Sequence, residues 1–154
     1  MFDCSPDAER WIIYALECLP ADVLDEYQNA LAFVCMDTSD GRRLTPAFRE
    51  QRDIIVLSER IVPRGYAVET ERRVRYFVFV VLHEIAHAVR QHQPPNEISE
   101  HENATQEAEA HALAFQWFNN YIRERNHPDL LEFGEEELTE AQEANQRAMR
   151  AALG

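Results

Sequence analysis

A long apolar segment in the middle of the chain constrains the fold more than any other feature. Residues 76–89 are apolar except for His83, Glu84 and His87, and they contain no glycine or proline. A helix through this segment is apolar almost all round, and such a helix packs at the centre of a domain because it has no polar face for water. The sequence therefore predicts a central helix over about residues 70–92, ended by the prolines that follow.

Shorter elements are predicted on both sides of this helix. Apolar residues recur there at helical spacing, and two compact segments are rich in strand-forming residues. The other predicted helices cover about 6–19, 20–29, 99–125 and 135–152, and the predicted strands cover 30–36 and 53–58. Residues 37–41 are typical of a turn, and 42–52 fit a short strand or a loop equally well. Ser99 and Glu102 have the spacing of a capping box.

Charge and cysteine content limit the expected partners and location. The chain has 28 acidic residues against 15 lysines and arginines, a formal net charge of −13. A surface of this sign repels nucleic-acid phosphates and anionic lipid heads, so neither nucleic acid nor a membrane is an expected partner. Three cysteines without a CxxC pair favour neither a disulfide framework nor a thiolate zinc site. The first residues lack the pattern of a signal peptide, and we expect a cytoplasmic protein.

The three polar residues of the central helix have the spacing of a zinc site. His83 and His87 are four residues apart, so they project from one helical face. Their imidazole nitrogens can reach one zinc ion at about 2.0–2.1 Å. Glu84 lies about 100° round the helix from His83, which suits a base that acts on a water molecule beside the metal. The alternative is a chance pattern whose side chains have ordinary hydrogen-bond partners.

A catalytic zinc ion needs a third protein ligand and one open position. The metzincin pattern requires a glycine and a third histidine downstream, but Arg90 and Gln93 occupy these positions, which excludes that class. The next predicted helix offers Glu107, with His111 four residues later on the same face. Glu107 is the preferred third ligand, and Glu109 and His111 are the alternatives.

Together the two motifs resemble the gluzincin-type HExxH zinc metallopeptidases, and more narrowly the ImmA/IrrE-like group, at the size of a minigluzincin. In that group the HExxH helix is followed by a helix with the pattern E-x-E-A-N-x-F-A. Residues 107–114 are similar to this pattern, with His111 in place of the asparagine and Leu113 in place of the phenylalanine. The resemblance covers residues 53–118.

This resemblance implies roles for individual side chains. It implies that His83, His87 and Glu107 bind zinc and that Glu84 is the catalytic residue. His111 replaces a residue that braces a zinc histidine in such enzymes. It would brace the histidine through a ring nitrogen, or be a ligand itself.

The resemblance also implies a fold and a place for the substrate. In gluzincin-like folds an edge strand beside the active-site helix binds an extended peptide through main-chain hydrogen bonds. The candidate strand consists of Ile54, Ile55, Val56, Leu57 and Ser58, and an ordinary core strand is the alternative. We expect one α+β, zincin-like domain over residues 1–154, with its core in 30–125 and a C-terminal helix at 135–152. A small antiparallel or mixed sheet would pack on the central helix and on a second, ligand-bearing helix.

These features predict a zinc-dependent endopeptidase that hydrolyses a peptide or protein substrate, with Glu84 as general base towards a zinc-activated water. The alternative is a catalytically weak or inactive zinc-binding domain that acts as a binding or regulatory module for a protein partner. His92 and His101 flank the connection between the two helices. We expect both to be solvated, or to make weak adventitious metal contacts, rather than to take part in catalysis.

Overall fold

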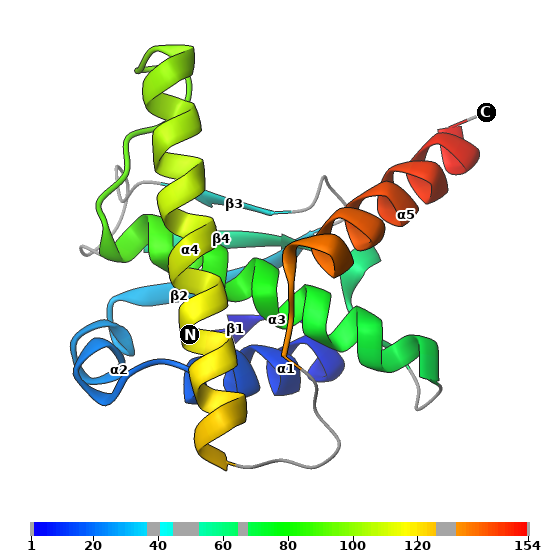
Figure 1. Ribbon diagram of the computed structural model, residues 1–154, viewed down its shortest axis with the longest axis horizontal. Coiled ribbons are helices and arrows are strands. Elements are labelled where there is room, and N and C mark those ends of the chain that lie inside the picture. The colour runs from blue at the N-terminus through cyan, green and yellow to red at the C-terminus, as the bar shows by residue number, and fades with distance from the viewer. Residues whose placement is uncertain (1, 37–40, 45–52, 65–67, 126–131, 154) are drawn as a thin grey trace.

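The computed structural model describes residues 2–36, 41–44, 53–64, 68–125 and 132–153, of which 41–44, 68–70, 145, 148, 149 and 151–153 are described by their backbone alone. Its helices are α1 Pro6–Glu17, α2 Ala21–Tyr27, α3 Val68–Val89, α4 Glu100–Arg125 and α5 Glu135–Leu153, and its strands are β1 Phe2–Asp3, β2 Leu31–Met36, β3 Gly41–Leu44 and β4 Asp53–Ser58, followed by a 3-10 turn at Glu59–Ile61. In Figure 1, α4 crosses in front of α3 and the strands lie behind it. No described helix is both long enough and apolar enough to span a bilayer.

The sheet is largely parallel. Its strand order is β1-β2-β4-β3, in which β1, β2 and β4 are parallel and only β3 runs antiparallel to its neighbour. The expected α+β class is confirmed. An antiparallel or mixed sheet was expected, and the described sheet has three strands, β1, β2 and β4, paired in parallel and only β3 antiparallel to β4. The reason is that β3 takes up part of the undecided segment 42–52 and lies on the far side of β4. The chain between β2 and β4 is therefore a crossover long enough for parallel pairing.

The strand predicted to bind substrate is internal. Every residue of β4 pairs with β2, and Ile54 to Leu57 also pair with β3. The main-chain groups along this stretch are used by two neighbours, so none is left to hold an extended peptide. The assignment of Ile54–Ser58 as the substrate-binding strand is therefore wrong. Residues Ile55 to Ser58 are buried, as in the alternative of an ordinary core strand.

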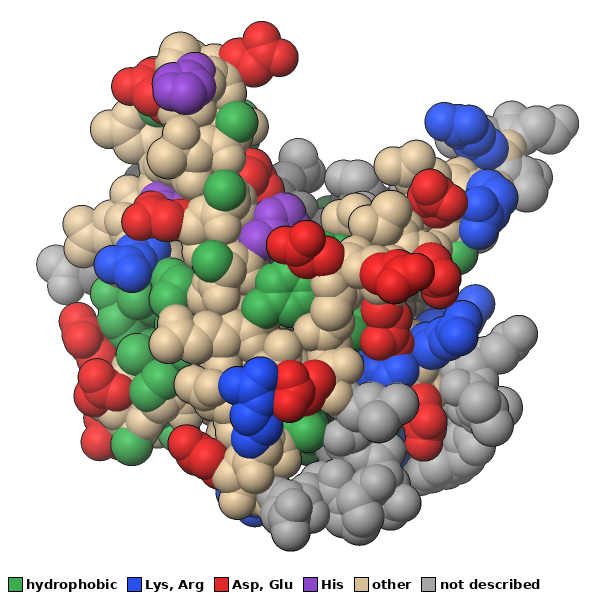
Figure 2. Space-filling view, in the orientation of Figure 1, with side chains coloured by type: hydrophobic (Ala, Val, Ile, Leu, Met, Phe, Trp, Pro, Cys, Tyr) green, Lys and Arg blue, Asp and Glu red, His purple; other side chains and the backbone are tan. Residues whose placement is uncertain are grey.

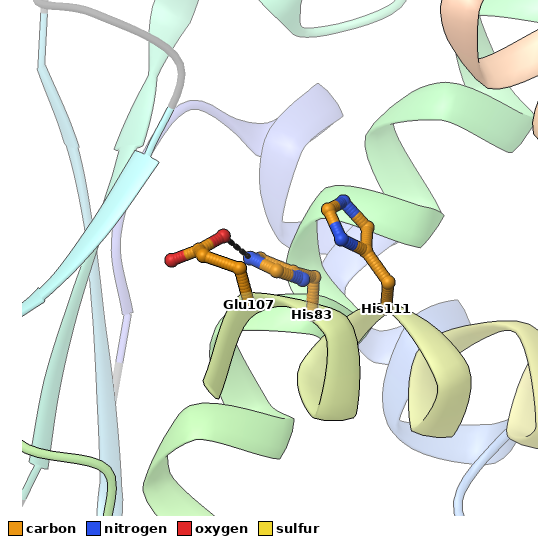
Figure 3. A group of neighbouring side chains, drawn as sticks. All are labelled: His83, Glu107 and His111. Carbon is orange, nitrogen blue, oxygen red and sulfur yellow. Dashed lines mark ion pairs between the residues drawn. The ribbon is translucent and has the colours of Figure 1, made fainter. Parts of the chain in front are cut away.

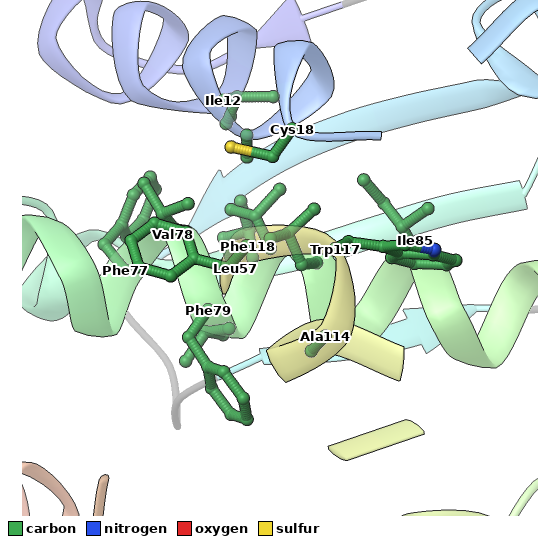
Figure 4. Close-up of a cluster of buried hydrophobic side chains, with 14 of the residues drawn as sticks. Ile12, Cys18, Leu57, Phe77, Val78, Phe79, Ile85, Ala114, Trp117 and Phe118 are labelled. Atoms are coloured by element: carbon green, nitrogen blue, oxygen red, sulfur yellow. The ribbon is translucent and has the colours of Figure 1, made fainter. Parts of the chain in front are cut away.

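The central helix is buried as its sequence predicts. Every residue from Val74 to Leu82 is at most 9% exposed, because the sheet, α1 and α4 surround α3. Figure 4 shows side chains from α1, β4 and α4 gathered around α3. On α4 the alanines Ala110 and Ala114 are fully buried, and their small side chains allow the two helices to approach closely. The core also takes in α1, whose Ile12 is fully buried, and so extends beyond residues 30–125.

Helix α4 begins at the predicted capping box. The Ser99 amide donates to the Glu102 carboxylate at 2.9 Å, and the Glu102 amide donates to the Ser99 hydroxyl at 3.3 Å. Each side chain thus satisfies a backbone donor that the first helical turn leaves without a partner. The capping box therefore defines where the helix begins.

Helix α5 is attached to the core at its N-terminal end. Phe133, just before the helix, is 1% exposed, and its ring lies 5.3 Å from that of Phe79. In the first turns of α5, Glu137 accepts a hydrogen bond from Arg75 Nε at 3.0 Å and pairs with the rest of the guanidinium. The Arg75 side chain is almost fully buried. The carboxylate of Glu137 therefore offsets the free-energy cost of removing the charged guanidinium from water.

Replacement of Glu137 by alanine is expected to lower the free energy of unfolding by about 1–3 kcal/mol, because it leaves a buried guanidinium without its acceptor. Urea denaturation followed by circular dichroism would measure the change. Glu136→Ala is the matched control, since Glu136 is exposed in the same helical turn and its replacement alters net charge and helix start equally. Equal losses in the two variants would show that the Arg75 contact contributes nothing.

Candidate metal centre

Three predicted ligand side chains meet where α4 crosses α3. His83 Nε2 lies 3.3 Å from Glu107 Oε2, and His87 Nε2 lies 3.5 Å from Glu107 Oε1. The two Nε2 atoms are 3.0 Å apart. Figure 3 shows the Glu107 carboxylate and the His83 ring directed towards each other across the helix crossing. The contact joins two motifs that are separate in the sequence.

The spacing of these donor atoms fits a tetrahedral ion. Ligand atoms on a tetrahedral zinc ion with bonds of about 2.0–2.1 Å lie about 3.3–3.4 Å apart. Here the two Nε2 atoms are 3.0 Å apart, and Glu107 has one oxygen 3.3 Å from His83 Nε2 and the other 3.5 Å from His87 Nε2. Two imidazole nitrogens and one carboxylate oxygen are also a donor set that zinc accepts in catalytic sites. The residues present therefore fit a zinc ion, although the donor set alone does not select zinc among the first-row metals.

His111 lies beside this group, on the opposite side of His83 from Glu107 in Figure 3. Its ring is 4.6 Å from the ring of His83 and stacks on Phe79 at 5.6 Å. His83, Glu107 and His111 each offer a ligand atom within 4.8 Å of the others, so they form a second possible metal-binding set. His111 therefore remains an alternative ligand on geometry, as in the sequence analysis.

The pKa shifts of two side chains on α4, Glu107 and His111, suit metal binding. The hydrogen bond with His83 holds the pKa of the Glu107 carboxyl below its ordinary value, although burial acts in the opposite direction. Burial lowers the pKa of His111, and the nearby His83 adds to the effect. An ionised carboxylate and neutral imidazoles are the forms that bind a metal ion.

The carboxylate of Glu109, the other glutamate considered as third ligand, contacts His92. It accepts a hydrogen bond from His92 Nε2 at 3.1 Å, and the Glu109 side chain is 54% exposed. The same histidine is joined through Nδ1 to His87 Nδ1 at 2.9 Å. Glu109 thus reaches the site only through two histidines, which weighs against it as the third ligand.

The position of His92 corrects the sequence analysis, which placed it in solvent. Its side chain is 6% exposed, because the chain folds back at the end of α3. The His92 amide donates to the His87 carbonyl and the Gln91 amide to the Ala88 carbonyl, both at 3.0 Å. This is the Schellman pattern, which requires a left-handed residue. Gln91 takes that role with φ of +53°. Since glutamine gives no signal for this turn, the sequence alone could not reveal it.

Replacement of Gln91 by glycine is expected to raise the free energy of unfolding by about 0.5–1 kcal/mol, because glycine adopts the left-handed conformation without steric cost. For a chain of this size the midpoint of thermal unfolding would rise by about 1–4 °C. The matched control is Arg90→Gly at the preceding position, where no positive φ is found and glycine should destabilise. Equal destabilisation by both glycines would contradict the left-handed turn.

The other residues singled out from the sequence, Glu84 and His101, lie on α3 and α4. Glu84 is 8% exposed on α3 and follows His83 directly in the chain. His101 is exposed near the start of α4, as expected. Trp117 and Phe118 are buried and pack α4 against the core.

No family model matches the chain, and no curated protein or solved structure matches it. The resemblance to gluzincin-type metallopeptidases therefore stays a prediction based on two motifs. Any inference about function has to come from the side chains of this site and their geometry.

Proposed function

We propose that the protein is a zinc-dependent endopeptidase. One observation carries the proposal: Nε2 of each histidine of a His-Glu-x-x-His helix lies within 3.5 Å of a carboxylate oxygen of Glu107 on the next helix, and the two Nε2 atoms are 3.0 Å apart. Such a constellation, with two histidines one helical turn apart and a glutamate between them, is the arrangement by which metallopeptidases bind zinc and supply a base.

In this proposal His83, His87 and Glu107 would hold the metal. Zinc, when bound, supplies Lewis-acid chemistry: it polarises the scissile carbonyl and lowers the pKa of a water molecule towards about 7. Glu84 would take a proton from a water molecule as the water oxygen bonds to the carbonyl carbon. As the carbon–nitrogen bond breaks, Glu84 gives the proton to the leaving amine nitrogen.

The proposed ligands are partly exposed: the side chain of Glu107 is 40% exposed, that of His83 12% and that of His87 15%. Figure 2 shows a hollow between the projecting parts of α4 and α5, with histidine and acidic side chains at its surface. At the sheet, β3 pairs with β4 on one side only within the described residues, and it contacts α3. We propose that an extended substrate adds to the free side of β3, in place of the internal strand that the sequence indicated.

Metal content and peptide hydrolysis together test this function. Full-length protein purified without chelators is analysed for zinc and then incubated with a mixed peptide library, with cleavage read by mass spectrometry. The proposal expects about one zinc ion per chain, and cleavage that stops when a chelator removes the metal and returns when zinc is restored. A wild-type chain that binds no zinc, even after reconstitution, would refute it.

A second candidate function is a zinc-binding module that recognises a protein partner without cleaving it. It is favoured by one observation, namely that His111, which stands where the family pattern has asparagine, stacks on Phe79 with ring centroids 5.6 Å apart. Stoichiometric zinc without cleavage of any library peptide would support this module over the peptidase.

A further inference from the structure

We propose that His92 and Glu109 are positioning residues that hold His87 in the one tautomer able to bind the metal. The inference rests on the proposed metal centre and adds two residues to it that the zinc-binding motifs do not contain. It is carried by a continuous chain of contacts, Glu109 Oε2 to His92 Nε2 at 3.1 Å and His92 Nδ1 to His87 Nδ1 at 2.9 Å.

The direction of each hydrogen bond follows from the carboxylate at the end of the chain. An ionised carboxylate only accepts, so Nε2 of His92 must carry the hydrogen. In a neutral His92 the other nitrogen, Nδ1, is then an acceptor, and Nδ1 of His87 must be the donor. This leaves the lone pair of His87 on Nε2, the atom that lies 3.0 Å from His83 Nε2 and 3.5 Å from Glu107.

The fold holds His92 where this chain of bonds requires it. The left-handed turn at Gln91 brings the His92 amide to the His87 carbonyl. The next residue, Gln93, is fastened to α4, because its amide donates to the Gln106 side chain at 2.7 Å and its carbonyl accepts from the same side chain at 3.3 Å. His92 is therefore fixed by main-chain contacts on both sides, and its ring has little freedom to turn away.

His83 and His87 differ in whether their Nδ1 atom has a hydrogen-bond partner. Nδ1 of His83 is buried and has no hydrogen-bond partner among the residues that the structure describes. Nδ1 of His87 has His92. Histidines that bind a metal ion usually donate their second N–H to a carboxylate, carbonyl or water, and loss of such a partner typically weakens metal binding by about 10–100-fold. In this chain that support reaches His87 through a second imidazole.

Zinc affinity of single and double variants tests the proposal. The full-length chain is titrated with zinc against a chromophoric chelator, and His92→Ala is expected to bind about 10–100-fold more weakly, still at one zinc per chain. Glu109→Ala should weaken binding in the same direction. Glu109→Gln should stay close to wild type, because its amide oxygen can accept the same hydrogen bond from His92. His101→Ala and Glu124→Ala, which remove an exposed histidine and an exposed glutamate of α4, should leave the affinity unchanged.

The double variant His92→Ala/Glu109→Ala tests whether Glu109 affects zinc affinity through His92, or instead acts as a ligand or through its charge alone. If Glu109 acts through His92, removal of Glu109 from a chain that already has His92→Ala should cause no further loss of affinity. Equal losses from Glu109→Ala with and without His92, or a Glu109→Gln variant as weak as Glu109→Ala, would overturn the proposal and make Glu109 a ligand or a general source of negative charge.

The imidazole tautomers give a reading that does not depend on zinc. Nitrogen-15 NMR of the metal-free protein at about pH 8, where ordinary imidazoles are neutral, should show His87 with its hydrogen on Nδ1 and His92 with its hydrogen on Nε2. In His92→Ala the His87 signal should lose this single form. A wild-type His87 with its hydrogen on Nε2 would refute the positioning role. A correct tautomer in a chain that binds no zinc would instead refute only the metal centre.

Discussion

Replacement of Glu84 by glutamine is expected to slow peptide hydrolysis by about 10²–10⁴-fold, the contribution typical of general acid–base catalysis. Glutamine has almost the same shape as glutamate but cannot take a proton from water at neutral pH. Because Glu84 is assigned no bond to the metal, the variant should still bind about one zinc ion per chain. The rate of cleavage of a library peptide, measured at saturating zinc, gives the effect.

Two controls make this result interpretable. Glu84 is 8% exposed, so the thermal midpoint of the variant must match the wild type for a kinetic reading. Glu71→Gln replaces an exposed glutamate of the same helix and should leave the rate unchanged. A Glu84→Gln protein that cleaves at the wild-type rate would remove Glu84 from the mechanism, and loss of zinc in this variant would make Glu84 a structural support of the site.

Removal of a metal ligand is expected to have the second large effect. If an apparent zinc-binding free energy of about 10–16 kcal/mol is spread over the three protein ligands, the loss of one costs roughly 3–5 kcal/mol, on the order of 10²–10⁴-fold in affinity. His83→Ala, His87→Ala and Glu107→Ala should each lose zinc during dialysis against a weak chelator. Elemental analysis of the dialysed proteins measures what remains.

The same series decides between the two sets of ligands. His111→Asn introduces the residue of the family pattern and should keep zinc at the wild-type level, since the proposed set of His83, His87 and Glu107 does not use His111. Loss of zinc in His111→Asn together with its retention in His87→Ala would favour the set made of His83, Glu107 and His111. Zinc retained in Glu107→Ala would exclude both sets and leave the third ligand elsewhere.

Local features of this protein could be predicted from its sequence, because they depend on neighbours along the chain. The apolar segment over residues 76–89 determined that α3 is central, and the spacing of His83 and His87 determined that both project from one face of it. The capping box at Ser99 likewise predicted where α4 begins. Helical geometry relates residues three and four apart independently of the rest of the fold.

Only the tertiary structure decided how these elements combine. The placement of β3 outside β4 made β4 internal, and the crossing of α4 over α3 brought Glu107, rather than Glu109, to the two histidines. Both depend on how distant segments pack, which no local spacing encodes. The position of His92 depends on a left-handed turn at Gln91, a residue with no preference for that conformation. The sequence by itself therefore determined which helix carries the candidate zinc histidines, and packing between elements determined the side chains that complete and support the site.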